Sequence, residues 1–277
     1  MNIKRSLKNF LKYIKSGGVV NTTVVSCHFD NYLAGKVVLV TGGTSGFGLA
    51  IANKCLAQGA SVIVTGRNKQ KMENVVNTIG NPKIKGMVWD LSDVSIVENK
   101  LEEANSIFGP ISVYVNNAGV WTPKNWKAID EKEWDNVVDI NLKGLFFMCK
   151  EEAHNLTIMT DTSNIIGKII NVTSIEGIRG GFGPYYASKW GANGLTKGLA
   201  KELIKNKIVV NAVAPGMAIT NINPNLPKDG NQYLECQPTG RFVLVEEIAD
   251  MVAYLAGDAA NSIVGQVIAI DGGWSLN

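Results

Sequence analysis

Cysteine and histidine are scarce in this chain. Its 277 residues include four cysteines and two histidines. The cysteines lie far apart and form no C-x-x-C pair, which excludes the common metal-binding and redox motifs. Because unpaired thiols are typical of a reducing compartment, we expect a cytoplasmic protein without a bound metal.

Long apolar runs, repeats and a strong net charge are absent as well. No run approaches the roughly 18 residues that a membrane-spanning helix needs. A net charge of +3 is too small to favour nucleic acid as a partner. The chain is long enough to bury a sizeable core, and its 45% hydrophobic and 18% charged residues are typical of a globular domain.

Acidic residues are missing before Asp30, and this stretch is basic. Apolar residues recur within 3–15 at helical spacing, so these residues predict a basic amphipathic helix. Such a helix either contacts a membrane surface or acts as a targeting peptide, or it packs on its own domain or a neighbouring subunit. We favour packing, because solvated lysine faces are common. Residues 19–27 predict a short strand or hairpin arm, so that 1–33 form an N-terminal extension and 34–277 a single domain.

From Gly35 onward, apolar β-branched runs alternate with helical patterns. Strands are expected at 37–41, 61–65, 84–89, 111–115, 168–173, 208–213 and 266–270. Helices are expected at 46–58, 68–79, 93–107, 131–156, 186–205 and 246–256. This alternation predicts an α/β fold in which helices cover both faces of a seven-stranded parallel sheet, as in a three-layer αβα Rossmann fold. A ligand would bind at the carboxyl ends of the strands.

A glycine-rich turn follows the first strand directly. Gly42, Gly46 and Gly48 have the spacing G-x-x-x-G-x-G, and a helical pattern follows. Gly42 allows a tight turn, Gly46 allows a pyrophosphate to approach the backbone, and Gly48 lets the helix lie close to the strand. An ordinary glycine-rich turn is the alternative, but the flanking strand and helix favour dinucleotide binding. The cofactor contacts predicted from this stretch are Gly42, Thr44, Ser45, Gly46, Phe47 and Gly48.

The second strand ends without an acidic residue. An acid at this point would bind the 2′-hydroxyl of NAD, whereas an arginine suits the 2′-phosphate of NADP. Arg67 stands there after Gly66. A lone arginine is usually a solvated surface residue, but its place relative to the glycine turn favours NADP(H) over NAD(H).

Two further strand ends predict cofactor contacts. Asp90 and Leu91 follow the third strand, where Asp90 either accepts a hydrogen bond from the adenine amino group or caps the next helix. Asn117, Ala118 and Gly119 follow the fourth strand. Small and amide residues there let the cofactor lie against the sheet edge, although such a tetrapeptide could equally be a turn.

Ser174, Tyr185 and Lys189 carry the candidate chemistry. Ser174 follows the fifth predicted strand, and Tyr185 and Lys189 are four residues apart at the start of a helix, so that their side chains face the same way. A free tyrosine has a pKa near 10, and a neighbouring ammonium is expected to lower it. Tyr185 would then exchange a proton with a substrate oxygen that Ser174 holds. Alone, such a pair is more often the edge of an amphipathic helix.

Taken together, these motifs resemble the short-chain dehydrogenase/reductase family in its single-domain branch. The resemblance runs from about Leu33 to Gly273 and rests on the glycine turn, the Asn-Asn-Ala-Gly run, and the Ser174, Tyr185 and Lys189 set. It implies that Tyr185 is the general acid, that Lys189 tunes it and binds the nicotinamide ribose, and that Ser174 orients the carbonyl. Asn141 would anchor a proton-relaying water chain. The resemblance further implies that the nicotinamide is bordered by Pro215, Gly216, Ile219 and Thr220.

The resemblance also implies a homodimer or homotetramer built from the 131–156 and 186–205 helices. Two features depart from the family pattern: the N-terminal extension, and a spacing from Ser174 to Tyr185 that is a couple of residues shorter than usual. The second departure concerns the shape of the substrate loop rather than the chemistry.

The resulting interpretation is an NADPH-dependent carbonyl reductase of 3-oxoacyl or keto-sugar type, an oxidoreductase acting on CH–OH groups. The alternatives are an NAD-dependent alcohol dehydrogenase and a catalytically silent scaffold that senses a dinucleotide. A small-molecule carbonyl or alcohol is the expected partner. The substrate pocket is expected to be lined by Trp121, Glu176, Arg179, Phe182 and the 217–240 segment, which we interpret as a lid.

Overall fold

The computed structural model describes residues 30–162, 166–220 and 231–276, together with five positions near the N-terminus. Those five are helical: Leu7, Lys8, Phe10, Leu11 and Ile14. The four apolar residues among them are exposed. The strand predicted at 19–27 lies outside the described residues, as do most of the helix predicted at 3–15 and residues 221–230 of the predicted lid. Leu33, by contrast, is fully buried in the core.

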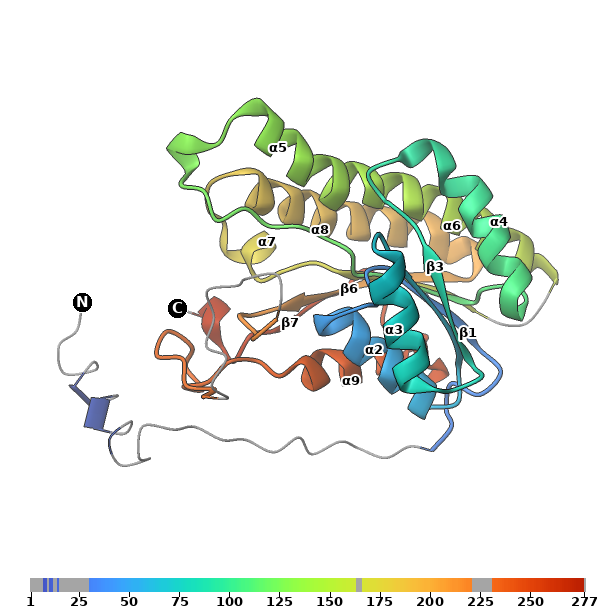
Figure 1. Cartoon of the computed structure of the whole chain (residues 1–277), viewed down its shortest axis with the longest axis horizontal. Helices are drawn as coiled ribbons and strands as arrows, with labels where there is room; N and C mark the ends of the chain where they lie inside the picture. The colour runs from blue at the N-terminus through green and yellow to red at the C-terminus, as the bar shows by residue number, and fades with distance from the viewer. Residues whose placement is uncertain are drawn as a thin grey trace.

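The predicted seven-stranded parallel sheet is confirmed (Figure 1). Its central strands are buried on both faces, as expected for a parallel sheet between two helix layers. Adjacent strands follow the order β3 (Ile84–Val88), β2 (Ser61–Gly66), β1 (Val37–Val40), β4 (Val113–Asn116), β5 (Gly167–Val172), β6 (Ile208–Pro215) and β7 (Val267–Ile270). The chain direction across the sheet reverses between β1 and β4, and this is where α/β folds open a ligand crevice.

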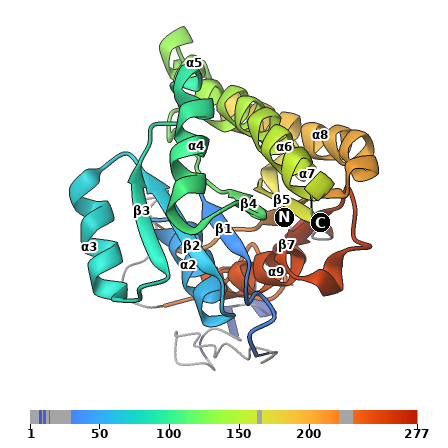
Figure 2. The same cartoon turned by 90° about the vertical axis from the view of Figure 1, so that its right-hand side faces the viewer.

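Helices cover both faces of the sheet, so the three-layer arrangement is also as predicted (Figure 2). One layer contains α2 (Gly46–Ala57), α3 (Lys69–Ile79) and α9 (Val245–Ala256). The other contains α4 (Val97–Phe108), α6 (Leu145–Thr162) and α8 (Pro184–Leu203). Alternate residues of each strand face the two layers: Val38 and Val40 pack in the first core, and Leu39 packs in the second. Because successive side chains of a strand point to opposite faces, both faces of every central strand are buried.

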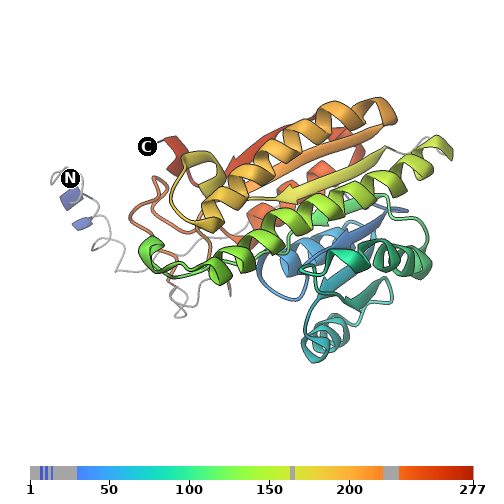
Figure 3. The same cartoon turned by 90° about the horizontal axis from the view of Figure 1, so that it is seen from above.

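The helix expected at 131–156 is divided in the structure. It consists of α5 (Glu131–Val138), the π-helical segment η3 (Asp139–Gly144) and α6. Gly144 allows the close packing of this segment, because a Cβ there would lie 2.7 Å from the carbonyl oxygen of Leu91. The path of η3 lies alongside α8, as the view in Figure 3 shows. Isolated π turns are frequent at functional sites, and this one contains Asn141. The four-residue helix α7 (Glu176–Arg179) was not predicted.

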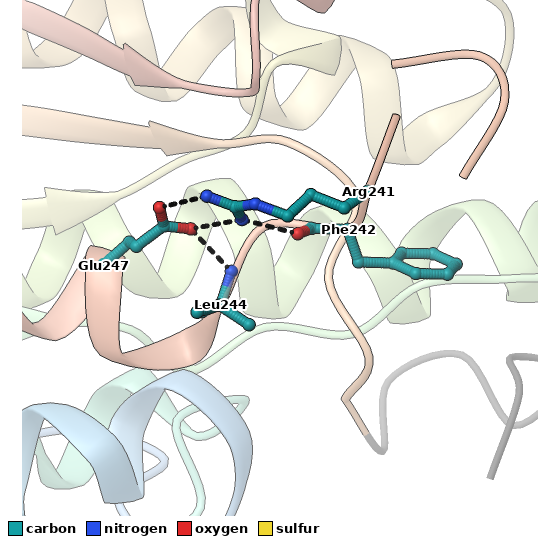
Figure 4. Close-up of polar contacts among 4 residues, drawn as sticks. All are labelled: Arg241, Phe242, Leu244 and Glu247. Carbon is teal, nitrogen blue, oxygen red and sulfur yellow. Dashed lines mark hydrogen bonds and ion pairs between the residues drawn. The ribbon is translucent and has the colours of Figure 1, made fainter. Parts of the chain in front are cut away.

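An ion pair joins the segment that follows the predicted lid to the first turn of α9 (Figure 4). The guanidinium of Arg241 binds both carboxylate oxygens of Glu247, at 2.7 and 3.0 Å, and donates to the carbonyl of Phe242 at 2.9 Å. Glu247 also accepts from the amide of Leu244 at 2.8 Å, which satisfies a free donor at the start of α9. Bidentate pairs of this kind are strong. The returning segment is therefore held close to the carboxyl end of β6.

Candidate active site

The glycine turn after β1 has the geometry of a phosphate cradle. Gly42 and Gly46 have φ values of 65° and 53°, which favour glycine. At Gly48, a Cβ would lie 2.4 Å from the carbonyl oxygen of Gly42 and 2.5 Å from Nδ2 of Asn117, so only glycine lets α2 begin this close to the strand. The amides at the N-terminus of α2 point to the crevice side of the sheet, where a pyrophosphate can accept from them.

A cavity of about 660 Å³ runs along the carboxyl ends of the strands. It brings together most of the residues predicted to contact a cofactor: Gly42, Thr44, Ser45, Gly46, Phe47, Arg67, Asp90, Leu91, Asn117, Ala118, Gly119, Tyr185, Lys189, Pro215, Gly216 and Thr220. Gly48 and Ile219 are not among the lining residues. Gly48 acts through helix packing instead, as its close contacts show.

One end of the cavity, which we call the adenosine end, is lined by Arg67, Lys71 and Asp90. Arg67 and Lys71 are both exposed, and both lie at the start of α3. Lys71 was missed in the sequence, although its place in the first turn of the helix after Arg67 is a usable signal. Oδ1 of Asp90 accepts from the amide and hydroxyl of Ser92, at 3.0 and 2.9 Å. The cap of the next helix is Asp93, so Asp90 fixes the preceding turn rather than the helix itself.

The asparagines after β4 tie neighbouring strands together. Asn117 donates through Nδ2 to the carbonyl of Thr41 at 2.9 Å. The buried Asn116 donates to Oδ1 of Asn171 at 3.1 Å and to Oε2 of Glu152 at 2.9 Å. Burial raises the pKa of the Glu152 carboxyl to about 8. This network fixes the ends of β4 and β5, and so holds the floor of the cavity in place.

The opposite end of the cavity, the catalytic end, brings Ser174, Tyr185 and Lys189 together. Ser174 follows β5, and its Oγ accepts from the amide of Glu176 at 3.2 Å. Because that bond uses a lone pair of Oγ, the Ser174 hydroxyl proton remains available, and it bonds to the Tyr185 hydroxyl. The ammonium of Lys189 donates to the carbonyl of Val172 at 3.1 Å and lies 5.7 Å from the centre of the Tyr185 ring.

The pKa of Tyr185 differs from the sequence-based expectation. Burial raises it to about 12, although a hydrogen bond between the Ser174 and Tyr185 hydroxyls acts in the opposite direction. The pKa is thus raised where the sequence predicted a lowering, because loss of hydration is the largest contribution. Burial also lowers the pKa of Lys189 to about 8. Tyr185 is therefore a protonated phenol at neutral pH, ready to donate.

Asn141 lies within η3, behind the catalytic end. Its Oδ1 accepts from the amide of Val120 and its Nδ2 donates to the carbonyl of the same residue, each at 2.8 Å. Nδ2 also lies 3.3 Å from Oγ of Ser188 on α8. A Cβ on Gly119 would lie 3.2 Å from Oδ1 of Asn141 and 3.6 Å from the ammonium of Lys189. The π turn therefore places Asn141 next to the lysine.

The substrate half of the cavity agrees only in part with the expected lining. Trp121 and Glu176 line it, but Arg179 and Phe182 do not. Met217 from the expected 217–240 segment lines the cavity as well, and the additional lining residues include Tyr186 and Trp274. Trp274 could have been anticipated, because it comes shortly after the carboxyl end of the last strand. Tyr186 could not, because its contribution depends on how α8 begins.

The described residues, which are 30–162, 166–220, 231–276 and the five N-terminal positions, contain neither the pattern of a metal site nor that of a membrane span. They contain no group of histidine, cysteine or acidic side chains that could hold a metal ion. No helix among them is long and apolar enough to cross a membrane.

A family model for short chain dehydrogenases matches residues 36–231. The chain is 35% identical over 247 residues to the 3-oxoacyl-acyl-carrier-protein reductase FabG of Aquifex aeolicus, covering 87% of this chain and 98% of the relative. It is 38% identical over 249 residues to the FabG of Thermotoga maritima, with coverages of 87% and 98%.

Solved structures agree with these matches. A 3-ketoacyl-acyl-carrier-protein reductase from Brucella melitensis, in complex with NADH, superposes with a TM-score of 0.81 at 30% identity and covers 88% of this chain and 99% of its own. An actinorhodin polyketide ketoreductase with NADPH gives a TM-score of 0.79 at 30% identity, with coverages of 90% and 100%. The chain thus belongs to the short-chain dehydrogenase/reductase family and is an oxidoreductase acting on CH–OH groups with a nicotinamide dinucleotide.

Proposed function

We propose that this protein is an NADPH-dependent carbonyl reductase in which Tyr185 is the general acid. One observation carries the proposal: a single cavity holds a protonated phenol beside an ammonium at one end and two cations at the other. A tyrosine phenol holds its proton at neutral pH, so it can donate to a carbonyl oxygen, whereas alcohol oxidation needs the phenolate.

The residues fit a dinucleotide that lies along the strand ends. The glycine turn and the start of α2 would hold its pyrophosphate, and Asn117, Ala118, Gly119, Pro215, Gly216 and Thr220 would border it toward the nicotinamide. Ile219, whose role was expected from the family, lies in the same stretch and would support this wall. When bound, the cofactor supplies the hydride.

The chain's own residues handle the proton. Ser174 donates a hydrogen bond to the substrate carbonyl oxygen and orients it, and Tyr185 gives its Oη proton to that oxygen. The ammonium of Lys189 stabilises the negative charge that then develops on Tyr185. Asn141, which is fixed on Val120 beside Lys189, is placed to hold the water that returns the proton.

Arg67 and Lys71 support a preference for NADP(H) over NAD(H). Both cations line the adenosine end, and Gly66 stands where an acid would repel a 2′-phosphate. Ser45 is not basic and adds no further charge, so the preference is moderate.

The apolar surface of α5, α6 and α8 supports a homodimer or homotetramer. Trp134, Phe146 and Trp190 are 43%, 46% and 53% exposed on these helices. Large exposed aromatic residues on adjacent helices are typical of subunit interfaces. Replacing Trp190 by Glu should shift the mass measured by light scattering toward the monomer.

We further infer that 1–33 are an N-terminal extension whose last residues, Tyr32 and Leu33, pack on the catalytic domain at 34–277, and that the protein is cytoplasmic. The free thiols of Cys55, Cys149 and Cys236 support a reducing location. Deleting residues 1–16 should leave NADPH binding intact, since every residue of the cavity comes after them.

The test of the proposed function is a rate assay with NADPH or NADH and a panel of ketones, keto sugars and 3-oxoacyl thioesters. NADPH oxidation that depends on a ketone is expected. Faster turnover with NAD⁺ and alcohols would favour the alcohol dehydrogenase. Binding of NADPH without turnover of any carbonyl would favour the silent scaffold.

A further inference from the structure

Glu176 places a carboxylate in the substrate half of the cavity. It is the first residue of α7 and comes two residues after Ser174, to whose Oγ its amide donates at 3.2 Å. Among the described residues that line the cavity, the only other acid is Asp90, at the adenosine end. The backbone amide of Glu176 is therefore bonded directly to Ser174, the residue that would orient the substrate carbonyl.

The carboxylate of Glu176 is not used by the fold. Within the described residues, its oxygens take part in no ion pair and accept no hydrogen bond from another side chain. Burial raises its pKa, while Arg179 lowers it. Its negative charge in turn raises the pKa of both Tyr185 and Tyr186, which line the same cavity. The half-buried carboxylate is therefore free to accept a hydrogen bond from a donor that a ligand brings into the cavity.

Aromatic side chains form the walls around this acceptor. Trp121, Tyr186 and Trp274 line the same half of the cavity. The guanidinium of Arg179 lies 4.4 Å from the centre of the Trp274 ring, which fixes the indole from its outer side. Flat apolar walls with a single aimed polar group are typical of sites for small molecules.

The nearby charges restrict what can bind to Glu176. An anionic substrate group would be repelled by the carboxylate. An ammonium would be attracted by Glu176 but repelled by Lys189 in the same cavity and by Arg179, which interacts electrostatically with Glu176. A neutral hydroxyl fits both conditions, because it donates a hydrogen bond and carries no charge.

We propose that Glu176 is the specificity-determining residue and accepts a hydrogen bond from a hydroxyl group adjacent to the reactive carbonyl. The substrate is then a neutral hydroxylated ketone, of cyclic or sugar type, whose ring packs between the aromatic walls. This inference rests on the proposed carbonyl reductase activity and chooses between its two substrate types. A 3-oxoacyl thioester has no hydroxyl donor beside its reactive carbonyl and leaves Glu176 without a partner.

A matched pair of substrates tests the inference. We would measure kcat/KM with NADPH for 2-hydroxycyclohexanone and for cyclohexanone, which differ by one hydroxyl. The wild-type protein should favour the hydroxyketone roughly ten- to a hundred-fold, as expected for a hydrogen bond to a charged group. Glu176→Leu should abolish that ratio, because the hydroxyketone loses its acceptor and cyclohexanone never used it. Glu176→Gln, which keeps an uncharged acceptor, should lie between the two.

Glu246→Gln is the control, because Glu246 is an exposed acid on α9, far from the cavity lining. It should keep the wild-type ratio. An equal loss on both ketones in the Glu176 variants would overturn the inference, because it would indicate a structural role. A wild-type ratio near one, or faster reduction of S-acetoacetyl-N-acetylcysteamine than of the hydroxyketone, would overturn it too. Absence of NADPH oxidation with all three substrates would instead refute the proposed function on which the inference rests.

Discussion

The two ends of the cavity differ in how they are built. At the catalytic end, Ser174 and Lys189 are 7% and 6% exposed, and both have hydrogen bonds to the backbone. At the adenosine end, Arg67 and Lys71 are exposed side chains at the start of a surface helix. The side chains of the catalytic end are held by burial, whereas those of the adenosine end carry charges that are exposed to water and salt.

Because of this difference, pH and ionic strength should affect the two ends of the cavity differently. Burial shifts the pKa of Tyr185 to about 12 and that of Lys189 to about 8, so the catalytic end should be sensitive to pH. Dissolved salt screens the interactions of exposed charges, and each such interaction adds little binding energy. The adenosine end should therefore be sensitive to ionic strength. The predictions below test this contrast, beginning with the largest effect.

Tyr185→Phe should lower kcat for ketone reduction by about 10²–10⁴-fold, because the ring stays while the proton donor is lost. The Kd for NADPH, measured by fluorescence titration, should stay near the wild-type value. Tyr254→Phe, on the partly exposed face of α9, is the matched control and should keep full activity. A Tyr185→Phe protein that retained more than about a tenth of the wild-type kcat would rule out this acid.

Gly66→Asp combined with Arg67→Ser should reverse the cofactor preference. The wild type should favour NADPH over NADH in kcat/KM by roughly ten- to a hundred-fold, and the double variant should favour NADH, because attraction is removed and repulsion added. A Cβ at Gly66 would lie 3.0 Å from Cγ2 of Thr44 and 3.2 Å from Cε of Met72. Gly66→Ala therefore measures the effect of crowding alone. A wild-type preference for NADH would contradict the role of Arg67.

Ketone reduction should slow as the pH rises above about 8, where Lys189 loses its proton. The cation below this pH stabilises the charge that develops on Tyr185, so the loss should approach about tenfold per pH unit. Tyr185 itself stays protonated over this range, since burial raises its pKa to about 12. In Lys189→Arg the decline should move to higher pH. A rate that stayed constant up to about pH 10 would show that the charge of Lys189 is not required.

Salt should have the smallest effect and should act on binding alone. Between about 50 and about 500 mM KCl, the KM for NADPH should rise by a few-fold while kcat stays constant, because Arg67 and Lys71 are exposed to screening. The KM for NADH should change less, since NADH lacks the 2′-phosphate. Arg67→Ser should reduce the salt dependence more than Lys71→Ser. Equal salt dependence for both cofactors would place the screened contacts elsewhere.

The strand and helix pattern could be predicted because it depends on local periodicity. Each strand expected from its β-branched run is present within a few residues, and the sheet is parallel throughout. The glycine turn could be predicted for the same reason, since its spacing alone requires two residues in the left-handed region and one close helix contact. The one large error within the described helices was η3, because a π turn arises from packing against Leu91 and α8 rather than from its own residues.

By itself, the sequence determined the fold, the family and the pairing of Tyr185 with Lys189, because four residues along a helix place two side chains on one face. Only the tertiary structure decided that burial makes Tyr185 a weaker acid rather than a stronger one. It also decided that Trp274 and Tyr186 line the same cavity as Glu176. Desolvation and long-range contacts depend on how distant segments pack together, and no local sequence pattern determines that packing.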